Sequence, residues 1–92
     1  MEVTNAITVM SALAQPTRLA VLTILTAAGP DGLTAGELAE RTGTPANTMS
    51  AHLTILSHAG LTASRRAGRN IIYRALPETV RDLTAYLTEN CG

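Results

Sequence analysis

The chain has 92 residues, which fits one small domain spanning residues 1–92, and its formal net charge is zero. Hydrophobic residues make up 46% of it, but there is no Trp or Phe and only two Tyr, so the core must be aliphatic. We expect no membrane segment, because no apolar run approaches the roughly 20 residues that span a bilayer. We expect no signal peptide, because no basic region precedes an apolar block at the N-terminus. One cysteine cannot form an internal disulfide, which fits a reducing cytoplasm.

The N-terminal segment predicts a helix over Val3–Ala14. Val3, Ile7, Met10 and Leu13, together with Val9 and Ala6, form its broad apolar stripe. A chain this short buries a limited core, so a terminal helix this apolar often packs against a second subunit. Packing within the same chain is an equally reasonable interpretation.

A second helix is predicted to begin at Gln15–Pro16, with the proline in its first turn. It has little polar surface, so we expect it at the centre of the core. Arg18 is a polar residue in this apolar neighbourhood. We expect it to make a structural ion pair or to cap a helix end. The segment Ala28–Gly32 is dense in turn formers and predicts a loop.

The stretch Gly36–Leu61 predicts two short helices joined by a tight turn. The first helix covers Leu33–Thr42, where Thr34 and Glu37 have the spacing of a capping box. Gly43 is expected to end it, because glycine adopts a positive φ at no steric cost.

The second helix of this pair is predicted over Pro45–Ala59, with Thr44 as its N-cap and Pro45 at its first helical position. Gly60 is expected to end it. One face carries the apolar residues Met49, Leu53 and Leu56. The other face begins with short side chains, which a recognition helix needs because its first turns meet the base edges. They are Asn47, Thr48, Ser50, Ala51 and His52. An ordinary solvated face is an equally reasonable interpretation.

After Gly60 the periodicity changes to that of a hairpin. The predicted strands are Leu61–Arg66 and Ile71–Leu76, joined by a turn at Ala67–Asn70. Its tip presents Arg66, Arg69 and Asn70. Such a wing can reach phosphates or an adjacent minor groove. A solvated hairpin with arginines for solubility is the alternative.

Charge is distributed unevenly along the chain. No acidic residue occurs from Thr42 to Pro77, and four arginines lie there, whereas the remainder holds seven acids and three arginines. The two parts therefore carry about +4 and −4, which suits a nucleic-acid binder with one basic surface. A last helix is predicted over Pro77–Asn90, with its apolar stripe at Val80, Leu83, Tyr86 and Leu87.

The order helix, helix, helix-turn-helix, wing and helix resembles the ArsR (ArsR/SmtB) family of bacterial winged-helix repressors. The matching pieces are Leu13–Leu22, Gly36–Ala39, Met49–Leu56, Ala59–Leu61 and Arg65–Tyr73. They cover nearly the whole chain. The resemblance implies a mainly α fold with a small β-hairpin, a winged helix-turn-helix that dimerises through its first and last helices.

By this resemblance, Pro45–Ala59 reads the major groove of a palindromic operator, and Ala67–Asn70 lies beside it. Family members repress transcription and release DNA when an effector binds. The implied DNA contacts are Asn47, Thr48, Ser50, Ala51 and His52, with Arg66, Arg69 and Asn70 from the wing. Ala51 stands where relatives often have a long polar side chain, and its methyl can contact only a thymine methyl. The implied dimer contacts are Ile7, Met10, Val80, Leu83 and Leu87.

The effector is the least defined part of the resemblance. The first helix of the pair lacks the cysteines of one family metal site, and the last helix lacks the histidine of another, so we expect no zinc sensor. The C-terminus resembles arsenic-responsive members, which implies arsenite or antimonite bound through Cys91. Trivalent arsenic is thiophilic and binds best to three thiolates, whereas a dimer of this chain offers two. An exposed cysteine without a role is an equally reasonable interpretation.

No catalytic pattern stands out: there is no nucleophile elbow, phosphate loop, metal-ligand triad or evident carboxylate pair, so we do not expect an enzyme. A different class remains open, a winged-helix dimerisation module that contacts protein and not DNA. Salt dependence separates the two, because DNA affinity that rests on phosphate contacts falls steeply with salt.

Overall fold

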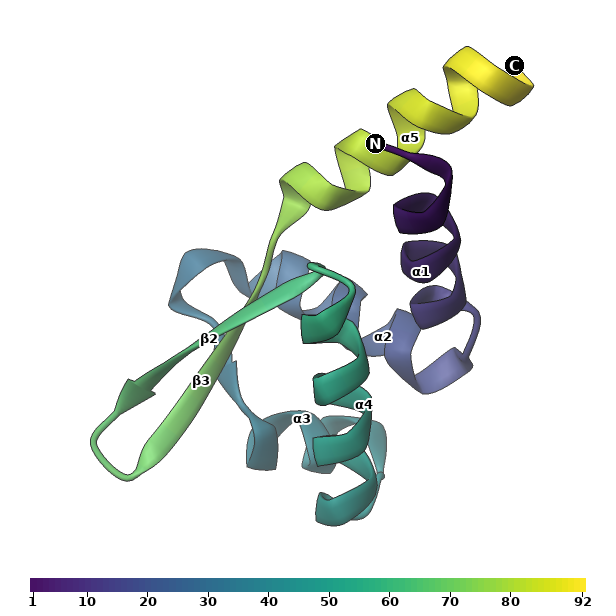
Figure 1. Cartoon of the computed structure of the whole chain (residues 1–92). Coiled ribbons are helices and arrows are strands. Elements are labelled where there is room, and N and C mark those ends of the chain that lie inside the picture. Colours follow the sequence, from purple (N-terminus) through teal and green to yellow (C-terminus); the bar gives the residue numbers. More distant parts are fainter.

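A computed structural model describes all 92 residues. The elements in chain order are α1 (Val3–Leu13), α2 (Pro16–Ala28), a short 3-10 helix η1 (Gly29–Asp31), β1 (Leu33–Thr34), α3 (Ala35–Thr42), α4 (Ala46–His58), β2 (Thr62–Ala67), β3 (Asn70–Ala75) and α5 (Pro77–Cys91) (Figure 1). The prediction of a mainly α winged helix-turn-helix with a small hairpin is confirmed. No single helix has the length and hydropathy of a bilayer crossing, and α1 joined to Pro16–Asp31 meets those criteria only as a pair bent by 96°.

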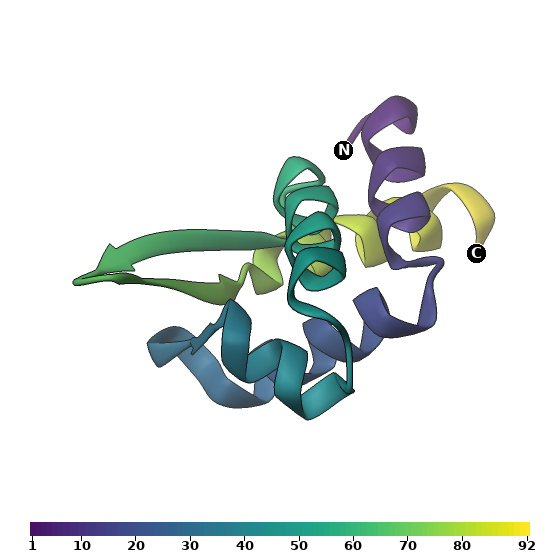
Figure 2. The same ribbon diagram turned by 90° about the horizontal axis from the view of Figure 1, so that it is seen from below.

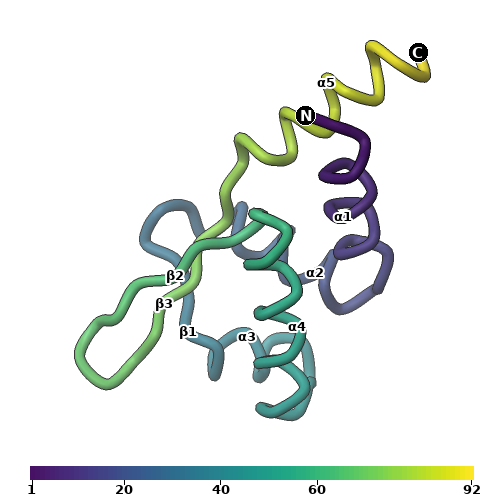
Figure 3. The backbone as a smooth tube through the Cα atoms, viewed as in Figure 1, coloured from purple at the N-terminus to yellow at the C-terminus, as the bar shows by residue number.

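The sheet has three antiparallel strands in the order β1-β3-β2. Leu33 was expected inside the first helix of the pair, and this was wrong: Leu33 and Thr34 form a short strand that pairs with Tyr73 and Ile72 of β3 (Figure 3). Thr34 can belong to both elements, because an N-cap residue has the extended backbone of a strand. The base of the wing is thereby joined to the helix-turn-helix.

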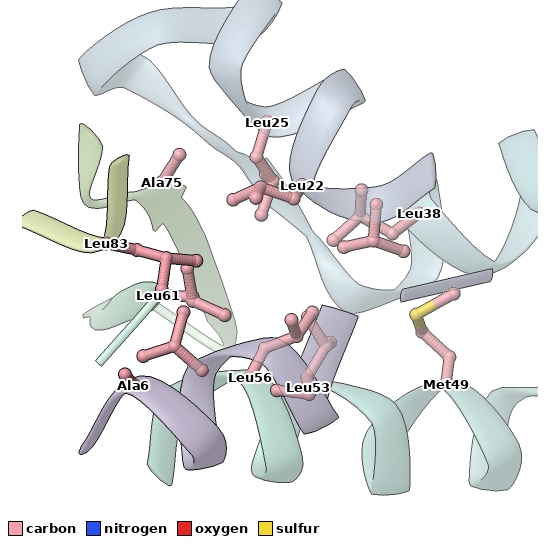
Figure 4. Close-up of a cluster of buried hydrophobic side chains, with 13 residues drawn as sticks. Ala6, Leu22, Leu25, Leu38, Met49, Leu53, Leu56, Leu61, Ala75 and Leu83 are labelled. Atoms are coloured by element: carbon pink, nitrogen blue, oxygen red, sulfur yellow. The ribbon is translucent and has the colours of Figure 1, made fainter. Parts of the chain in front are cut away.

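All five α-helices contribute to one aliphatic core, as the composition predicts (Figure 4). Its largest fully buried side chains come mainly from α2, α3 and α4. They are Val21, Leu25, Leu38, Met49, Leu53, Leu56 and Leu61. The predicted core face of α4 is therefore confirmed, and it positions the rest of that helix.

Helix α1 has two apolar faces with different surroundings. Its small residues Ala6, Val9 and Ala12 are buried against the body of the chain. Two larger residues of the predicted stripe face outward, with Ile7 59% and Met10 38% exposed. Small side chains allow α1 to approach its neighbours closely, so the bulkier ones remain on the outer side.

Helix α5 leaves the body beside the N-terminus of α1, and its last turns project outward (Figure 1). Leu83, an expected dimer contact, is only 8% exposed in the single chain. It packs in the chain's own core and is not available to a second subunit. Val80 and Leu87 are half-buried.

Candidate nucleic-acid interface

The predicted capping box at the start of α3 is confirmed. The Thr34 side-chain oxygen accepts a hydrogen bond from the Glu37 backbone N–H at 3.1 Å, and the Glu37 carboxylate accepts one from the Thr34 backbone N–H at 2.9 Å. The bonds from Thr34, first of all the one from its backbone N–H, hold the pKa of the Glu37 carboxyl below its ordinary value. Gly43 ends the helix in the left-handed conformation with φ 64°, as expected.

The start of α4 differs from the prediction. Pro45 is the N-cap and not the first helical residue, and its extended ψ of 147° places the helix start at Ala46. Thr44 does not cap the helix, because its hydroxyl lies 2.8 Å from the hydroxyl of Thr42. No side chain caps α4, so the N–H groups of its first turn face outward without a side-chain acceptor.

The polar face of α4 lies opposite its buried face. Four of the predicted contact residues are exposed: Asn47, Thr48, Ser50 and Ala51. The Ser50 hydroxyl donates to the Ala46 carbonyl at 3.1 Å, so its oxygen remains free to accept from a base or from solvent. The geometry offers short hydrogen-bonding groups on the first turns of the helix.

His52 differs from those four residues. It is half-buried, and at 100° per residue it lies only about 70° from the middle of the buried face. Its Nδ1 lies 3.3 Å from Nη1 of Arg18 on α2. Arg18 Nε also donates to the Ala12 carbonyl near the end of α1 at 2.6 Å, so the prediction that Arg18 caps a helix end is confirmed.

The later turns of α4 expose further residues that were not predicted as DNA contacts, among them Thr54, Ile55 and His58. The helical period that singled out Asn47 extends to them, so the signal was present. They lie later in the helix than the first turns, where a recognition helix is expected to meet the base edges.

The wing is the predicted hairpin with a shorter turn than expected. Ala67 pairs with Asn70, which leaves Gly68 and Arg69 as a two-residue connection. Gly68 has φ 63° while Arg69 does not have a positive φ, as in a type II′ turn. The tip residues Arg66, Arg69 and Asn70 are exposed, whereas Arg65 donates to the Asp31 carbonyl at 3.2 Å.

The wing tip and the first turns of α4 lie toward the same end of the molecule in Figure 1. The view from below shows the hairpin reaching well away from the helices (Figure 2). The predicted helix contacts and wing contacts are thus two separate groups, one on a helix of the body and one on a projecting hairpin (Figure 2).

Comparisons with known proteins agree with this geometry. A family model described as a helix-turn-helix domain matches residues 13–65. An ArsR-like transcriptional regulator from Rhodococcus sp. RHA1 is 31% identical with a TM-score of 0.82, over 94% of this chain and 78% of that chain. The chain belongs to the ArsR family. No curated protein sequence matches it.

Two further structures extend the comparison for this ArsR-family chain. The homodimeric winged helix-turn-helix DNA-binding domain Mb0332 from Mycobacterium bovis is 30% identical with a TM-score of 0.76, over 91% of this chain and 76% of that one. The transcriptional repressor BigR from Xylella fastidiosa is 26% identical with a TM-score of 0.68, over 92% and 85% of the two chains. ArsR-family members of this kind are DNA-binding transcription regulators.

The residue predicted to bind an effector in this ArsR-family chain lies on a different element from the predicted DNA contacts. Cys91 is the last residue of α5 and is exposed. Within one chain, no group of three His, Cys, Asp or Glu residues lies close enough to hold a metal ion. A soft ion would therefore need thiolates from more than one chain.

Proposed function

We propose that this ArsR-family protein is a homodimeric transcriptional repressor that binds a palindromic operator. Helix α4 enters the major groove, and the β2–β3 wing lies on the adjacent backbone or minor groove. The observation that carries this proposal is that helix α4 exposes Asn47, Thr48, Ser50 and Ala51 and that its first turns lie toward the same end of the molecule as the tip of the wing (Figure 1). Binding to the chromosome would place the protein in the cytoplasm.

The charge around this face supports contact with a polyanion. The side chains of Arg66, Arg69 and Arg74 are exposed, and no acid lies between Thr42 and Pro77. An arginine neutralises a phosphate with directed hydrogen bonds. The helix supplies groups that can read base edges, and the wing supplies charge.

The outer face of α1 supports the homodimer. Val3, Ile7 and Met10 form an exposed apolar face, which a second copy of the chain would cover together with the half-buried Val80 and Leu87 of α5. A two-fold dimer presents two α4 helices in opposite senses, so its operator would be palindromic.

Dimer formation can be tested with Ile7→Glu, which places a charge in the middle of the exposed apolar face. We expect monomers by analytical ultracentrifugation and a loss of operator binding. Thr23→Glu adds the same charge to the exposed surface of α2 and should leave the dimer intact. A dimer that survives Ile7→Glu would exclude this face as the interface.

Arsenite is the effector that we propose to test first, because Cys91 is an exposed thiol at the end of α5. Two chains would supply two thiolates, and a small thiol in the buffer could supply the third. Cys91→Ser should keep DNA affinity and lose any response to arsenite. If the variant still releases DNA in response to arsenite, arsenite does not act through Cys91.

The experiment for the main proposal is fluorescence anisotropy with labelled duplex DNA from upstream of the protein's own gene and with random duplex DNA. We expect tighter binding to the upstream duplex and a steep fall of affinity with salt. The same titration with arsenite under reducing conditions tests for release. No binding to either duplex at low salt would favour the alternative, a module that contacts protein.

A further inference from the structure

The contact between Arg18 and His52 joins two parts of the chain that are 34 residues apart in sequence. Arg18 is itself held at two further points. Its backbone N–H donates to Gln15 Oε1 at 2.8 Å, and its Nε donates to the Ala12 carbonyl at 2.6 Å. The bond from Nε therefore holds the guanidinium in place beside the histidine ring.

The chemistry of the pair determines how the ring is protonated. A guanidinium has only donors, so the ring nitrogen that faces it must accept. Nδ1 of His52 is then unprotonated, and the neutral ring carries its proton on Nε2. Because the Arg18 guanidinium donates to Nδ1, the ring itself can donate a hydrogen bond from Nε2.

The other nitrogen of the ring is open to the outside. Arg18 is the hydrogen-bond partner of His52 within the chain, through Nδ1. No buried side-chain nitrogen or oxygen in the chain lacks a partner, so Nε2, which has none, must reach solvent. The half-buried ring thus has one nitrogen fixed by the protein and one available to a ligand.

We infer that Arg18 is a positioning residue that makes His52 a fixed Nε2–H donor toward the operator. This inference rests on the proposed function, in which α4 lies in the major groove. There the donor selects acceptors, which are N7 or O6 of guanine, N7 of adenine and O4 of thymine, and it disfavours the exocyclic amine of cytosine. Arg18 influences operator choice without touching DNA.

A double-mutant cycle tests this role. Arg18→Met keeps the aliphatic stem and removes every donor, while His52→Ala removes the ring. Each single variant should lower the ratio of operator to random-DNA affinity by about tenfold. In the His52→Ala background, Arg18→Met should lower that ratio little further, because the two residues act through one contact. Losses that add, or an unchanged ratio in Arg18→Met, would overturn the inference.

A spectroscopic readout on free protein keeps the test independent of DNA and of the variant's folding. Long-range ¹H–¹⁵N correlation spectra of the wild-type rings should show His52 with unprotonated Nδ1 and protonated Nε2. In Arg18→Met the His52 Nδ1 resonance should move, while that of the exposed His58 serves as the internal reference. A proton on Nδ1 of His52 in the wild type would overturn the inference. Wild-type protein that binds operator no better than random DNA would instead refute the proposed function.

Discussion

Helix α4 and the β2–β3 wing both carry proposed DNA contacts, but the protein holds them in different ways. Helix α4 is anchored by Met49, Leu53 and Leu56, which are at most 1% exposed. The outer four residues of β2 are exposed, and the tip is held by the strand ladder and a two-residue turn. Base reading needs side chains fixed closely by packing, whereas phosphate contacts tolerate more freedom. The difference assigns specificity to the helix and general affinity to the wing.

The largest expected effect comes from removing an anchor of the helix. Leu53→Ala should lower the free energy of unfolding by about 2–5 kcal/mol, because it leaves a cavity in the aliphatic core. The matched change in the wing, Ile71→Ala, removes a side chain that is 43% exposed and should cost about 0.5 kcal/mol or less. Urea unfolding followed by circular dichroism measures both. Similar losses would mean that the wing is as firmly packed as the helix.

The next effect concerns the base of the wing. Gly32 has φ 70°, and a Cβ there would lie 2.2 Å from the Tyr73 carbonyl oxygen. Gly68 at the tip also has a positive φ, but a Cβ there would meet nothing within 4 Å. Gly68→Ala should therefore cost about 1–2 kcal/mol from backbone strain alone, and Gly32→Ala should cost more in the same urea experiment. Equal losses would show that β1 and β3 separate easily.

Local sequence signals predicted much of this fold. The capping box of Thr34 and Glu37, the stop at Gly43 and the buried face of α4 depend on residues a few positions apart. Strand β1 was not predicted, because two residues are too few to show the alternating pattern of a strand. Only its pairing with Tyr73 and Ile72 defines it. The faces of α1 were undetermined for a similar reason: small Ala6 is buried because its neighbours approach closely, which no pattern within α1 shows.

Substitutions at the proposed DNA contacts should distinguish helix α4 from the wing through smaller changes, measured in DNA affinity. Asn47→Ala should cost about 1–3 kcal/mol on the operator and less on random DNA, because this side chain would contact base edges. Arg69→Ala should weaken binding to both duplexes and reduce the salt slope by about one, because it would contact a phosphate. Anisotropy titrations at several salt concentrations measure both effects. Equal losses for Asn47→Ala on the two duplexes would mean that it only positions the helix.

The candidate site was predictable only in part. Helical periodicity placed Asn47 and Ala51 on an exposed face, and the hairpin pattern placed Arg69 at its tip. The same helical period placed His52 among the exposed DNA contacts, whereas its ring is half-buried and lies against Arg18. That contact depends on how α2 packs beside α4, which local patterns do not encode.

The smallest expected effect lies in the cap that joins the wing's base to the helix-turn-helix. The pKa of Glu37 is lowered in the folded chain by the bonds from Thr34, so the full stabilisation from its carboxylate is present above the ordinary pKa of a glutamate. This contribution is lost as the pH falls through the lowered folded-state pKa.

Glu37→Gln keeps an acceptor without the charge, so the wild type should be slightly more stable at pH 7. The gap in stability between the two proteins should close as the solution is acidified. Glu40→Gln removes the same charge from α3 outside the capping box and reports the effect of net charge alone. Thermal unfolding of all three proteins from pH 7 to pH 3 measures the gap, and a gap that does not change with pH would contradict a charged cap at the point where β1 passes into α3.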